Sequence, residues 1–394
     1  MRKDTLSLTA ARGIGPLISL VLIVLLGRMR GPEEVGYFGI ALAAFALMEA
    51  VTSLGMRHLL PRELAGSVDK GVVTTAAAVC FGTGILLSLL IIPILITFVE
   101  DAAASVILFV LPALPIAGLM VVAEGYWLAR FRVSRVINAL LVEQLVRGAL
   151  SIVLLSTGYG VKSLILSFVI GRCVAFSIAI PDCGWQRPRI DTLRALLKQV
   201  PPFVALELCF QAYWRVDVIL LGILSTARET GYYVVAYRLF SGLLLLPQSY
   251  GQILLPRFTV SKDAGLLRKS LRDMLFAGIV LFIFIHIVGY HIIDVLYGGG
   301  YERSGSILLI LAIGFIGACV DQPQGRLLIA RGRQLWDLSA LSGAVVVNVI
   351  LNLILIPSYG GIGAAWATVL SLFVSVTIHG VGIRNLSAPT ADEA

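Results

Sequence analysis

Charged side chains inside long apolar segments are the residues of this chain most able to do chemistry. Five arginines lie within such segments rather than in the loops between them, and they are Arg147, Arg172, Arg215, Arg238 and Arg326. A guanidinium in an apolar environment costs at least about 2.5 kcal/mol, so such residues face a bundle interior or a water-filled cavity. Because guanidinium groups bind phosphate and carboxylate groups well, the arginines predict a cationic interior that binds an anionic ligand.

A structural interpretation of the arginines stays open beside this one. Glu143 and Arg147 stand four residues apart, on one helical face, and form a pair that needs no ligand. Asp217 is placed to reach Arg238 on the following helix, whereas Arg172 has no acidic partner on its own helix. The arginines therefore either bind a ligand or hold helices together through ion pairs.

Acidic side chains in the apolar segments form a second set. They are Glu49, Glu124, Glu143, Glu207, Asp217 and Asp321. A carboxylate in a low-dielectric cavity binds a proton readily or holds a cation, so these residues are candidates for ion coupling. Asp321 is followed by Gln322-Pro323-Gln324, for which the sequence predicts either an unwound site or a kink.

The composition places these charges in a membrane protein. Charged residues make up 14% of the 394 residues, hydrophobic residues make up 58%, and the mean hydropathy is +0.94. Soluble domains carry about 25% charged residues. The five cysteines form no CxxC motif and the four histidines form no cluster with them. We therefore expect no metal site, and no cofactor beyond a coupling proton or sodium ion.

Twelve apolar segments have the length needed to span a bilayer and so to position the buried charges. They cover residues 10–28, 36–59, 72–98, 103–128, 135–157, 160–181, 200–224, 230–257, 273–296, 304–330, 335–357 and 361–383. The loops between them are short. The sequence therefore predicts an all-α membrane protein with about twelve transmembrane helices.

Arginine and lysine are unevenly divided between the two sets of loops. With the N-terminus inside, 21 of the 31 basic residues fall in cytoplasmic segments and five fall in outward loops. The positive-inside rule then places both termini in the cytoplasm. Since this topology accounts for the net charge of +8, we expect no nucleic-acid partner.

Short motifs recur between the two halves of the chain at a nearly constant offset. Residues 34–38 (EVGYF) return as 229–233 (ETGYY), 59–62 (LLPR) as 254–257 (LLPR), and 159–160 (YG) as 359–360 (YG). The repeats predict a duplicated unit. We expect an N-terminal six-helix lobe over residues 1–181, a cytoplasmic linker over 182–199 and a C-terminal six-helix lobe over 200–394. Six spans in each half give both lobes the same orientation, as in a parallel repeat.

Longer patterns carry a family resemblance. They are Gly31-x-Glu33-Glu34-x-Gly36-Tyr37-Phe38, Arg215-x-Asp217, Gly231-Tyr232-Tyr233-x-x-Ala236-Tyr237-Arg238-Leu239, and Leu353-x-x-x-Ile356-Pro357-x-Tyr359-Gly360-x-x-Gly363-Ala364-Ala365-Trp366-Ala367-Thr368. With them, nearly the whole chain resembles the bacterial polysaccharide (oligosaccharide) flippases of the multidrug/oligosaccharidyl-lipid/polysaccharide exporter superfamily. By this resemblance, Arg215, Asp217 and Arg238 occupy motif positions of the second lobe.

The resemblance implies two six-helix lobes around a central lumen, with no enzymatic activity. It also implies flipping of an undecaprenyl-diphosphate-linked oligosaccharide across the bacterial inner membrane by alternating access. Membrane lipids and a polysaccharide polymerase or export machinery are the expected partners, whereas O-antigen, capsule and exopolysaccharide stay open as products. The remaining alternative is a cation-coupled multidrug exporter of the same superfamily. It is disfavoured because span 10–28 lacks the aspartate of the drug-exporting relatives.

Overall fold

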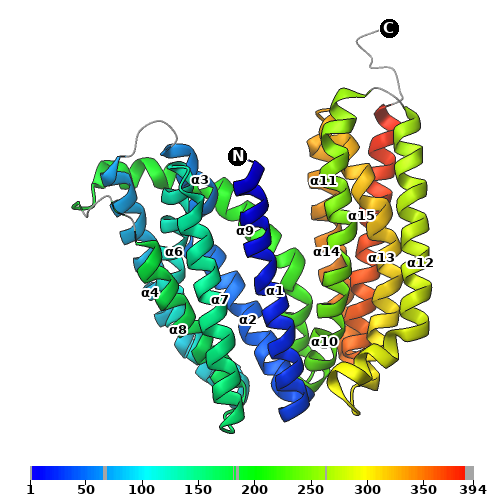
Figure 1. Ribbon diagram of the computed structural model, residues 1–394, viewed down its shortest axis with the longest axis horizontal. Helices are drawn as coiled ribbons and strands as arrows, with labels where there is room; N and C mark the ends of the chain where they lie inside the picture. Colours follow the sequence, from blue (N-terminus) through cyan, green and yellow to red (C-terminus); the bar gives the residue numbers. More distant parts are fainter. Residues whose placement is uncertain (1, 65–68, 181, 183–185, 262–263, 387–394) are drawn as a thin grey trace. The chain divides into compact units, whose positions relative to one another are not determined.

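The computed structural model describes residues 2–64, 69–180, 182, 186–261 and 264–386, and all regular secondary structure within them is α-helical (Figure 1). The all-α class predicted from the sequence is confirmed. The helices are α1 (Arg2–Arg30), α2 (Pro32–Thr52), α3 (Met56–Glu63), α4 (Lys70–Phe98), α5 (Asp101–Val110), α6 (Ala113–Ala129), α7 (Val133–Ser156), α8 (Val161–Ala179), α9 (Ile190–Leu224), α10 (Ala227–Leu243), α11 (Leu245–Val260), α12 (Ala264–Tyr297), α13 (Glu302–Ala330), α14 (Gln334–Tyr359) and α15 (Gly361–Leu386).

Each predicted span corresponds to one helix or to one broken pair of helices. The broken pairs are α2–α3, α5–α6 and α10–α11. Among the described residues, nine of the twelve spans have the length and the apolar composition needed to cross a membrane. The other three are α1, α9 and the α10–α11 pair, and α9 and α10 carry Arg215, Asp217 and Arg238.

The breaks within the pairs have local causes. Between α2 and α3, Gly55 has a φ of 66°, a left-handed conformation that glycine adopts without steric cost. Pro112 separates α5 from α6, and Pro247 follows the break between α10 and α11 by three residues. A proline ring has no N–H to donate and clashes with the preceding turn. By contrast, α13 continues through Pro323, so the unwound segment considered at Asp321–Gln324 is wrong.

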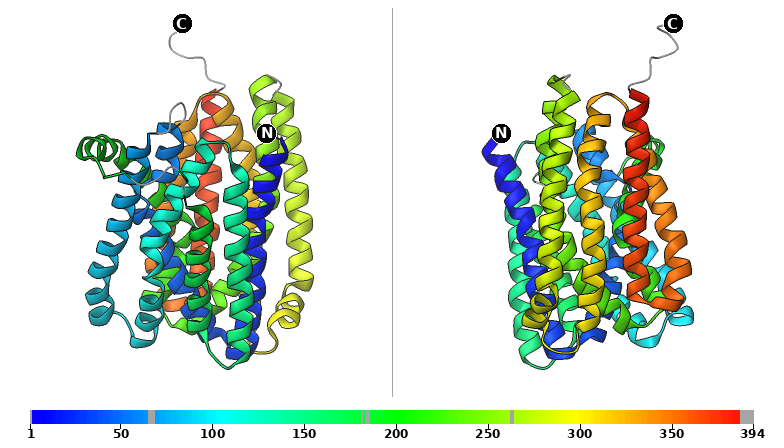
Figure 2. Two further views of the ribbon diagram at one scale, coloured as in Figure 1. Left: turned by 60° about the vertical axis from the view of Figure 1, so that its left-hand side comes forward. Right: turned by 90° about the vertical axis from the view of Figure 1, so that its right-hand side faces the viewer.

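The chain divides into two compact units, Met1–Arg215 and Val216–Ala394, with the boundary inside α9. In the first unit, α7 packs against α8 and α1, and α6 packs against α3 and α4. In the second unit, α12, α13, α14 and α15 lie alongside one another (Figure 2). The linker over 182–199 stays a prediction; residues 183–185 lie outside the described residues, and residues from Ile190 onward form the start of α9.

The repeated motifs meet each other within each unit. Glu34 in α2 accepts a hydrogen bond of 2.7 Å from the backbone N–H of Val161, the first residue of α8. Glu229 in α10 accepts one of 3.0 Å from the backbone N–H of Gly361, the first residue of α15. A helix N-terminus has unpaired N–H groups and a positive partial charge, so a carboxylate stabilises it.

The glycine of each repeated Tyr-Gly pair makes room for this carboxylate. A Cβ atom on Gly160 would lie 2.5 Å from Oε2 of Glu34, and one on Gly360 would lie 2.5 Å from Oε2 of Glu229. The second unit adds Arg303, whose Nε lies 2.6 Å from Oε1 of Glu229. One short repeat therefore supplies the glutamate and another supplies the glycine beside it. Together they form the same contact once in each unit.

We expect Glu34→Ala and Glu229→Ala to destabilise the protein by about 1–3 kcal/mol each, because each leaves a helix N-terminus without its acceptor. Thermal unfolding in detergent micelles measures the effect as a lowered midpoint. Glu63→Ala is the matched control, since Glu63 is exposed at the end of α3. Variants that melt at the temperature of the control would contradict this assignment.

Candidate functional site

Arg172 is the centre of a charge cluster in the first unit. Its guanidinium lies 3.2 Å from the carboxylate of Glu143 in α7 and 3.3 Å from that of Glu49 in α2. The rings of Phe45 and Phe168 stand 5.9 and 5.2 Å from the guanidinium carbon, at the distance of cation–π contacts. Helix α8 has no acidic partner for Arg172. The two carboxylates come from α7 and α2, which lie beside α8 only in the folded protein.

Arg147, one turn beyond Glu143 on α7, is bound differently. The Glu143 carboxylate reaches Arg172 instead of Arg147, and Arg147 donates a hydrogen bond to the hydroxyl of Ser19 in α1. Arg147 is only 7% exposed, and its Nε has no hydrogen-bond partner among the described residues. No carboxylate in the described part of the chain lies within 4 Å of its guanidinium. Glu143 therefore forms its close ion pair with Arg172 and acts on Arg147 electrostatically at longer range.

The other acids of the first unit extend the cluster towards α3 and α9. Arg57 at the start of α3 lies 3.9 Å from Glu49 and 3.8 Å from Glu207. His58 Nε2 lies 3.3 Å from the Glu207 carboxylate. The Gln211 side chain donates a 3.0 Å hydrogen bond to the same carboxylate. Glu207 therefore fixes α9 to α3 within this unit.

Arg57 and His58 belong to this cluster although the sequence reasoning left them out. They follow Gly55 at the end of a predicted span, and this polar pair beside a helix break was the signal available. Glu124 in α6 adds a further negative charge near Arg172. The cluster thus contains acids and bases together, and the cationic interior predicted from the arginines alone is balanced by carboxylates around Arg172.

Asp217 is the centre of a hydrogen-bond network in the second unit. Its carboxylate, in a residue only 5% exposed, accepts hydrogen bonds of 2.7 Å from the Tyr233 hydroxyl, 2.9 Å from the Thr368 hydroxyl and 2.6 Å from the Asn352 amide. The donors belong to α10, α15 and α14. Asn352 also donates to Asn348, at 2.9 Å. These donors are uncharged, so they stabilise the carboxylate without cancelling its charge.

The sequence reasoning did not single out these donors as site residues. Asn348 and Asn352 stand four residues apart in an otherwise apolar span, which places them on one helical face. That pattern was a usable signal. Tyr233 lies in the repeated 229–233 motif and Thr368 lies in the last of the family patterns. Those motifs marked both positions, but their spacing did not indicate a hydrogen bond to Asp217.

Asp321 belongs to a further cluster of the second unit. It accepts hydrogen bonds from Ser375, at 2.7 Å, and from Nδ1 of His379, at 2.9 Å, both in α15. The other ring nitrogen of His379 lies 3.3 Å from Asp337 in α14. Arg326, one turn beyond Gln322 on α13, donates a 3.2 Å hydrogen bond to the Gln322 side chain.

The last two predicted arginines are Arg215 and Arg238. Arg215 is the last residue of the first unit and is exposed within it, whereas Arg238 in α10 is half-buried and acts electrostatically on Tyr297. Both engage in polar or electrostatic contacts. The predicted site residues therefore fall into separate networks, one around Arg172 and others around Asp217 and Asp321.

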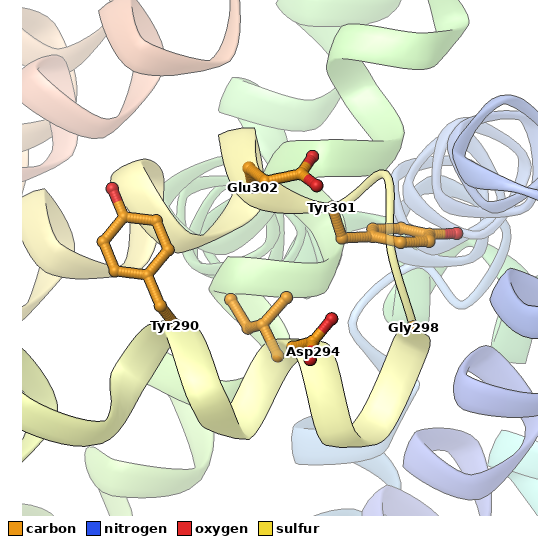
Figure 3. A pocket seen from close by; sticks show the side chains of 6 residues that line it. Tyr290, Asp294, Gly298, Tyr301 and Glu302 are labelled. Atoms are coloured by element: carbon orange, nitrogen blue, oxygen red, sulfur yellow. The ribbon is translucent and has the colours of Figure 1, made fainter.

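A small pocket lies between the end of α12 and the start of α13, with a volume of about 130 Å³. Tyr290 and Tyr301 stand on either side of it, with Asp294 and Glu302 between them (Figure 3). Burial raises the pKa of Tyr301 above its ordinary value, so its phenol stays neutral. Ligand pockets usually hold about 300 Å³ or more, so this pocket fits a few water molecules rather than an oligosaccharide.

The apolar helices, the duplicated unit and the buried charges define a multi-pass membrane protein of the transporter type. Its fold is similar to that of the lipid II flippase MurJ in an inward closed conformation, with a TM-score of 0.81 at 18% identity, covering 96% of this chain and 87% of that one. It is also similar to an inward-facing multidrug resistance MATE family transporter of the MOP superfamily, with a TM-score of 0.73 at 13% identity, covering 94% of each chain. Residues 25–306 match the polysaccharide biosynthesis protein family, and the chain belongs to that family.

Two relatives come from Haloferax volcanii. The probable low-salt glycan biosynthesis flippase Agl15 is 23% identical over 96% of this chain and 82% of its own length. The probable flippase AglR is 29% identical over 54% of this chain and 43% of its own length. Both relatives are described as probable flippases, and the two structural neighbours are described as a flippase and a transporter.

The charge cluster around Arg172 makes a thermodynamic prediction. Arg172→Gln leaves the Glu143 carboxylate, whose side chain is 4% exposed, without its close counter-charge, and removal of one partner of a buried pair costs about 3 kcal/mol or more. We expect Glu143→Gln to recover a large part of that loss in the double variant. Unfolding midpoints of the two single variants and the double variant form the cycle.

Arg62→Gln, at an exposed position of α3, is the control for this cycle. A double variant no more stable than Arg172→Gln would show that the unpaired Glu143 carboxylate is not the cause of the destabilisation.

Proposed function

We propose that this protein flips an undecaprenyl-diphosphate-linked oligosaccharide across the cytoplasmic membrane during polysaccharide biosynthesis. Membership of the polysaccharide biosynthesis protein family supports the pathway. Relatives that are described as probable flippases support the type of transport. The two units would alternate access to the two sides of the membrane by moving relative to each other, as a parallel repeat permits.

Arg147 is the observation that carries this proposal. It is a buried guanidinium whose described hydrogen bond goes to the neutral hydroxyl of Ser19, and its Nε has no described hydrogen-bond partner. Glu143 acts on it only electrostatically, and so does the like charge of Arg172. A buried charge is stable only when it is paired or hydrogen-bonded. The diphosphate of a lipid-linked sugar has the charge and the acceptor oxygens to complete this site.

Arg172 has a different role in this proposal. Two carboxylates already lie within 3.3 Å of its guanidinium, so it is not available to a diphosphate unless they release it. We assign Arg172 to the positioning of α2, α7 and α8 around Arg147. The protons or cations that pass through Glu49 and Glu143 would then control this arrangement.

Asp217 is the group we assign to ion coupling in the second unit. When it is ionised, its carboxylate is stabilised by neutral donors, and Oδ1 of Asn352 beside it is buried with no donor among the described residues. A proton or a sodium ion bound here would neutralise that charge. Because α10, α14 and α15 all contribute donors, occupancy of the site would affect the packing of the whole unit.

The cellular setting follows from the distribution of charge. The excess of arginine and lysine in one set of loops supports a cytoplasmic position for both termini. The family resemblance of the motifs favours a bacterial inner membrane, whereas Agl15 and AglR are archaeal. A polysaccharide polymerase or an export complex would take up the flipped lipid-linked sugar on the outer side.

The proposal is tested by transbilayer movement of an undecaprenyl-diphosphate oligosaccharide in proteoliposomes. We expect Arg147→Ala to slow this movement about tenfold or more, because charge-assisted hydrogen bonds contribute about 1.5–3 kcal/mol. Arg147→Lys keeps the charge and should retain part of the rate. Arg228→Ala, at an exposed position in the first turn of α10, should leave the rate unchanged.

Movement at the wild-type rate by correctly folded Arg147→Ala would remove Arg147 from the substrate site. No movement of several lipid-linked sugars by the wild type, together with efflux of a cationic dye, would establish the multidrug exporter instead.

Asp217→Asn is the corresponding variant for ion coupling. It preserves the size of the side chain but removes the charge that a proton or sodium ion would neutralise. We expect transport to lose its acceleration by an ion gradient while a slower movement without a gradient remains. Comparing imposed sodium and proton gradients identifies the ion, and full acceleration in Asp217→Asn would exclude this carboxylate.

A further inference from the structure

His379 stands between two carboxylates near one end of the second unit. Nδ1 is within hydrogen-bond distance of Oδ1 of Asp321 in α13, at 2.9 Å. Nε2 lies 3.3 Å from Oδ1 of Asp337 in α14, close enough for an ion pair, although it forms no hydrogen bond among the described residues. The His379 residue is 3% exposed. Among the described residues, Asp321 and Asp337 are the charged groups that act on its ring. Helix α10 also packs on α15, but it meets the other end, where Glu229 contacts Gly361.

This geometry selects a protonation state of the ring. Neutral imidazole carries one N–H, so its other nitrogen presents a lone pair, whereas imidazolium donates at both nitrogens. Ionised carboxylates offer only acceptor oxygens. With a carboxylate oxygen facing each nitrogen, imidazolium is the form with attractive contacts on both sides.

Asp337 is more exposed than Asp321, so a proton can reach His379 from the Asp337 side. The Asp337 side chain is 45% exposed and the Asp321 side chain is 15% exposed. Asp337 lies in the first turn of α14, next to the short turn that follows α13. The distribution of arginine and lysine places this turn in the cytoplasm. A proton on Nε2 can therefore exchange with water at the Asp337 side.

Gly325 of α13 permits the close approach of these groups. A Cβ atom at this position would lie 2.9 Å from Oδ1 of Asp337 and 3.0 Å from Cε1 of His379. Three helices thus converge on one ring, with α13 contributing both a carboxylate and the space beside it. An alanine at position 325 would push Asp337 and His379 apart.

We propose that Asp321, His379 and Asp337 form a proton-binding site that couples occupancy by a cytoplasmic proton to the packing of α13, α14 and α15. When the Nε2–H bond breaks, the proton leaves to water past Asp337, and a bare ring nitrogen then faces a carboxylate oxygen. That contact is repulsive, so α14 separates from α15 at this end. Binding of a proton restores the contact. The proposal extends the ion coupling of the proposed function and names the proton as the ion.

The first test reads the proton directly and needs no transport. In protein labelled with ¹⁵N-histidine in lipid nanodiscs at pH 7, we expect one of the four histidines to show both ring nitrogens protonated. That signal should be absent in His379→Gln and should change to a single-N–H form in Asp337→Asn and in Gly325→Ala. His291→Gln, at an exposed position of α12, should leave it in place. A single N–H on His379 in the wild type would overturn the proposal.

The second test measures coupling in proteoliposomes with an imposed proton gradient. We expect His379→Gln to lose the acceleration by the gradient while its movement of lipid-linked sugar without a gradient persists, and His291→Gln to keep both. Full acceleration in folded His379→Gln would overturn the coupling and leave the flippase standing. If the wild type moves no lipid-linked sugar, the proposed function fails, and the ¹⁵N spectra still decide the proton site.

Discussion

Every ionised side chain that these helices carry into the membrane must find its counter-charge or its hydrogen bonds within the protein, because hydrocarbon supplies neither. This constraint explains the arrangement of both units. Arg172 is held by Glu143 and Glu49, and Asp217 is held by donors from three helices. The same constraint acts on the backbone. Glu34 and Glu229 accept hydrogen bonds from the backbone N–H groups at the starts of α8 and α15.

The charges around Arg172 in the first unit and around Asp217 in the second unit meet this constraint with different chemistry. In the first unit, charges are balanced mainly by charges, in a series that runs from Glu143 through Arg172 and Glu49 to Arg57 and Glu207. In the second unit, the Asp217 carboxylate is held by neutral hydroxyl and amide donors. An ion-pair network resists rearrangement because breaking one partner leaves the other buried and unpaired. A carboxylate among neutral donors can gain or lose a small cation with less disturbance. The two units of the duplicated fold therefore differ in how they hold these two buried charges.

The shared contact explains why the internal repeat is short and scattered. The residues that recur are those whose geometry is required twice: the glutamate, and the Tyr-Gly pair whose glycine lets the carboxylate approach. The surfaces around Arg172 and Asp217 have no such common requirement, and their sequences differ. The sequence is thus repeated between the halves where helices must be joined, and it differs around Arg172 and Asp217.

The sequence by itself determined the helical class, the number of spans and the duplication, because these depend on local hydropathy and on motifs that need no partner to be seen. It also identified Arg147, Arg172, Asp217 and Asp321 as charges within membrane helices, since a charge inside an apolar run is visible in the sequence alone. Arg147 and Asp217 are buried, and Arg172 and Asp321 are partly buried. Only the tertiary structure decided their partners. Glu143 makes its close ion pair with Arg172, and His379 lies between two carboxylates from other helices. Such contacts depend on the rotation of each helix about its axis and on its position along that axis, which spacing along the sequence does not specify.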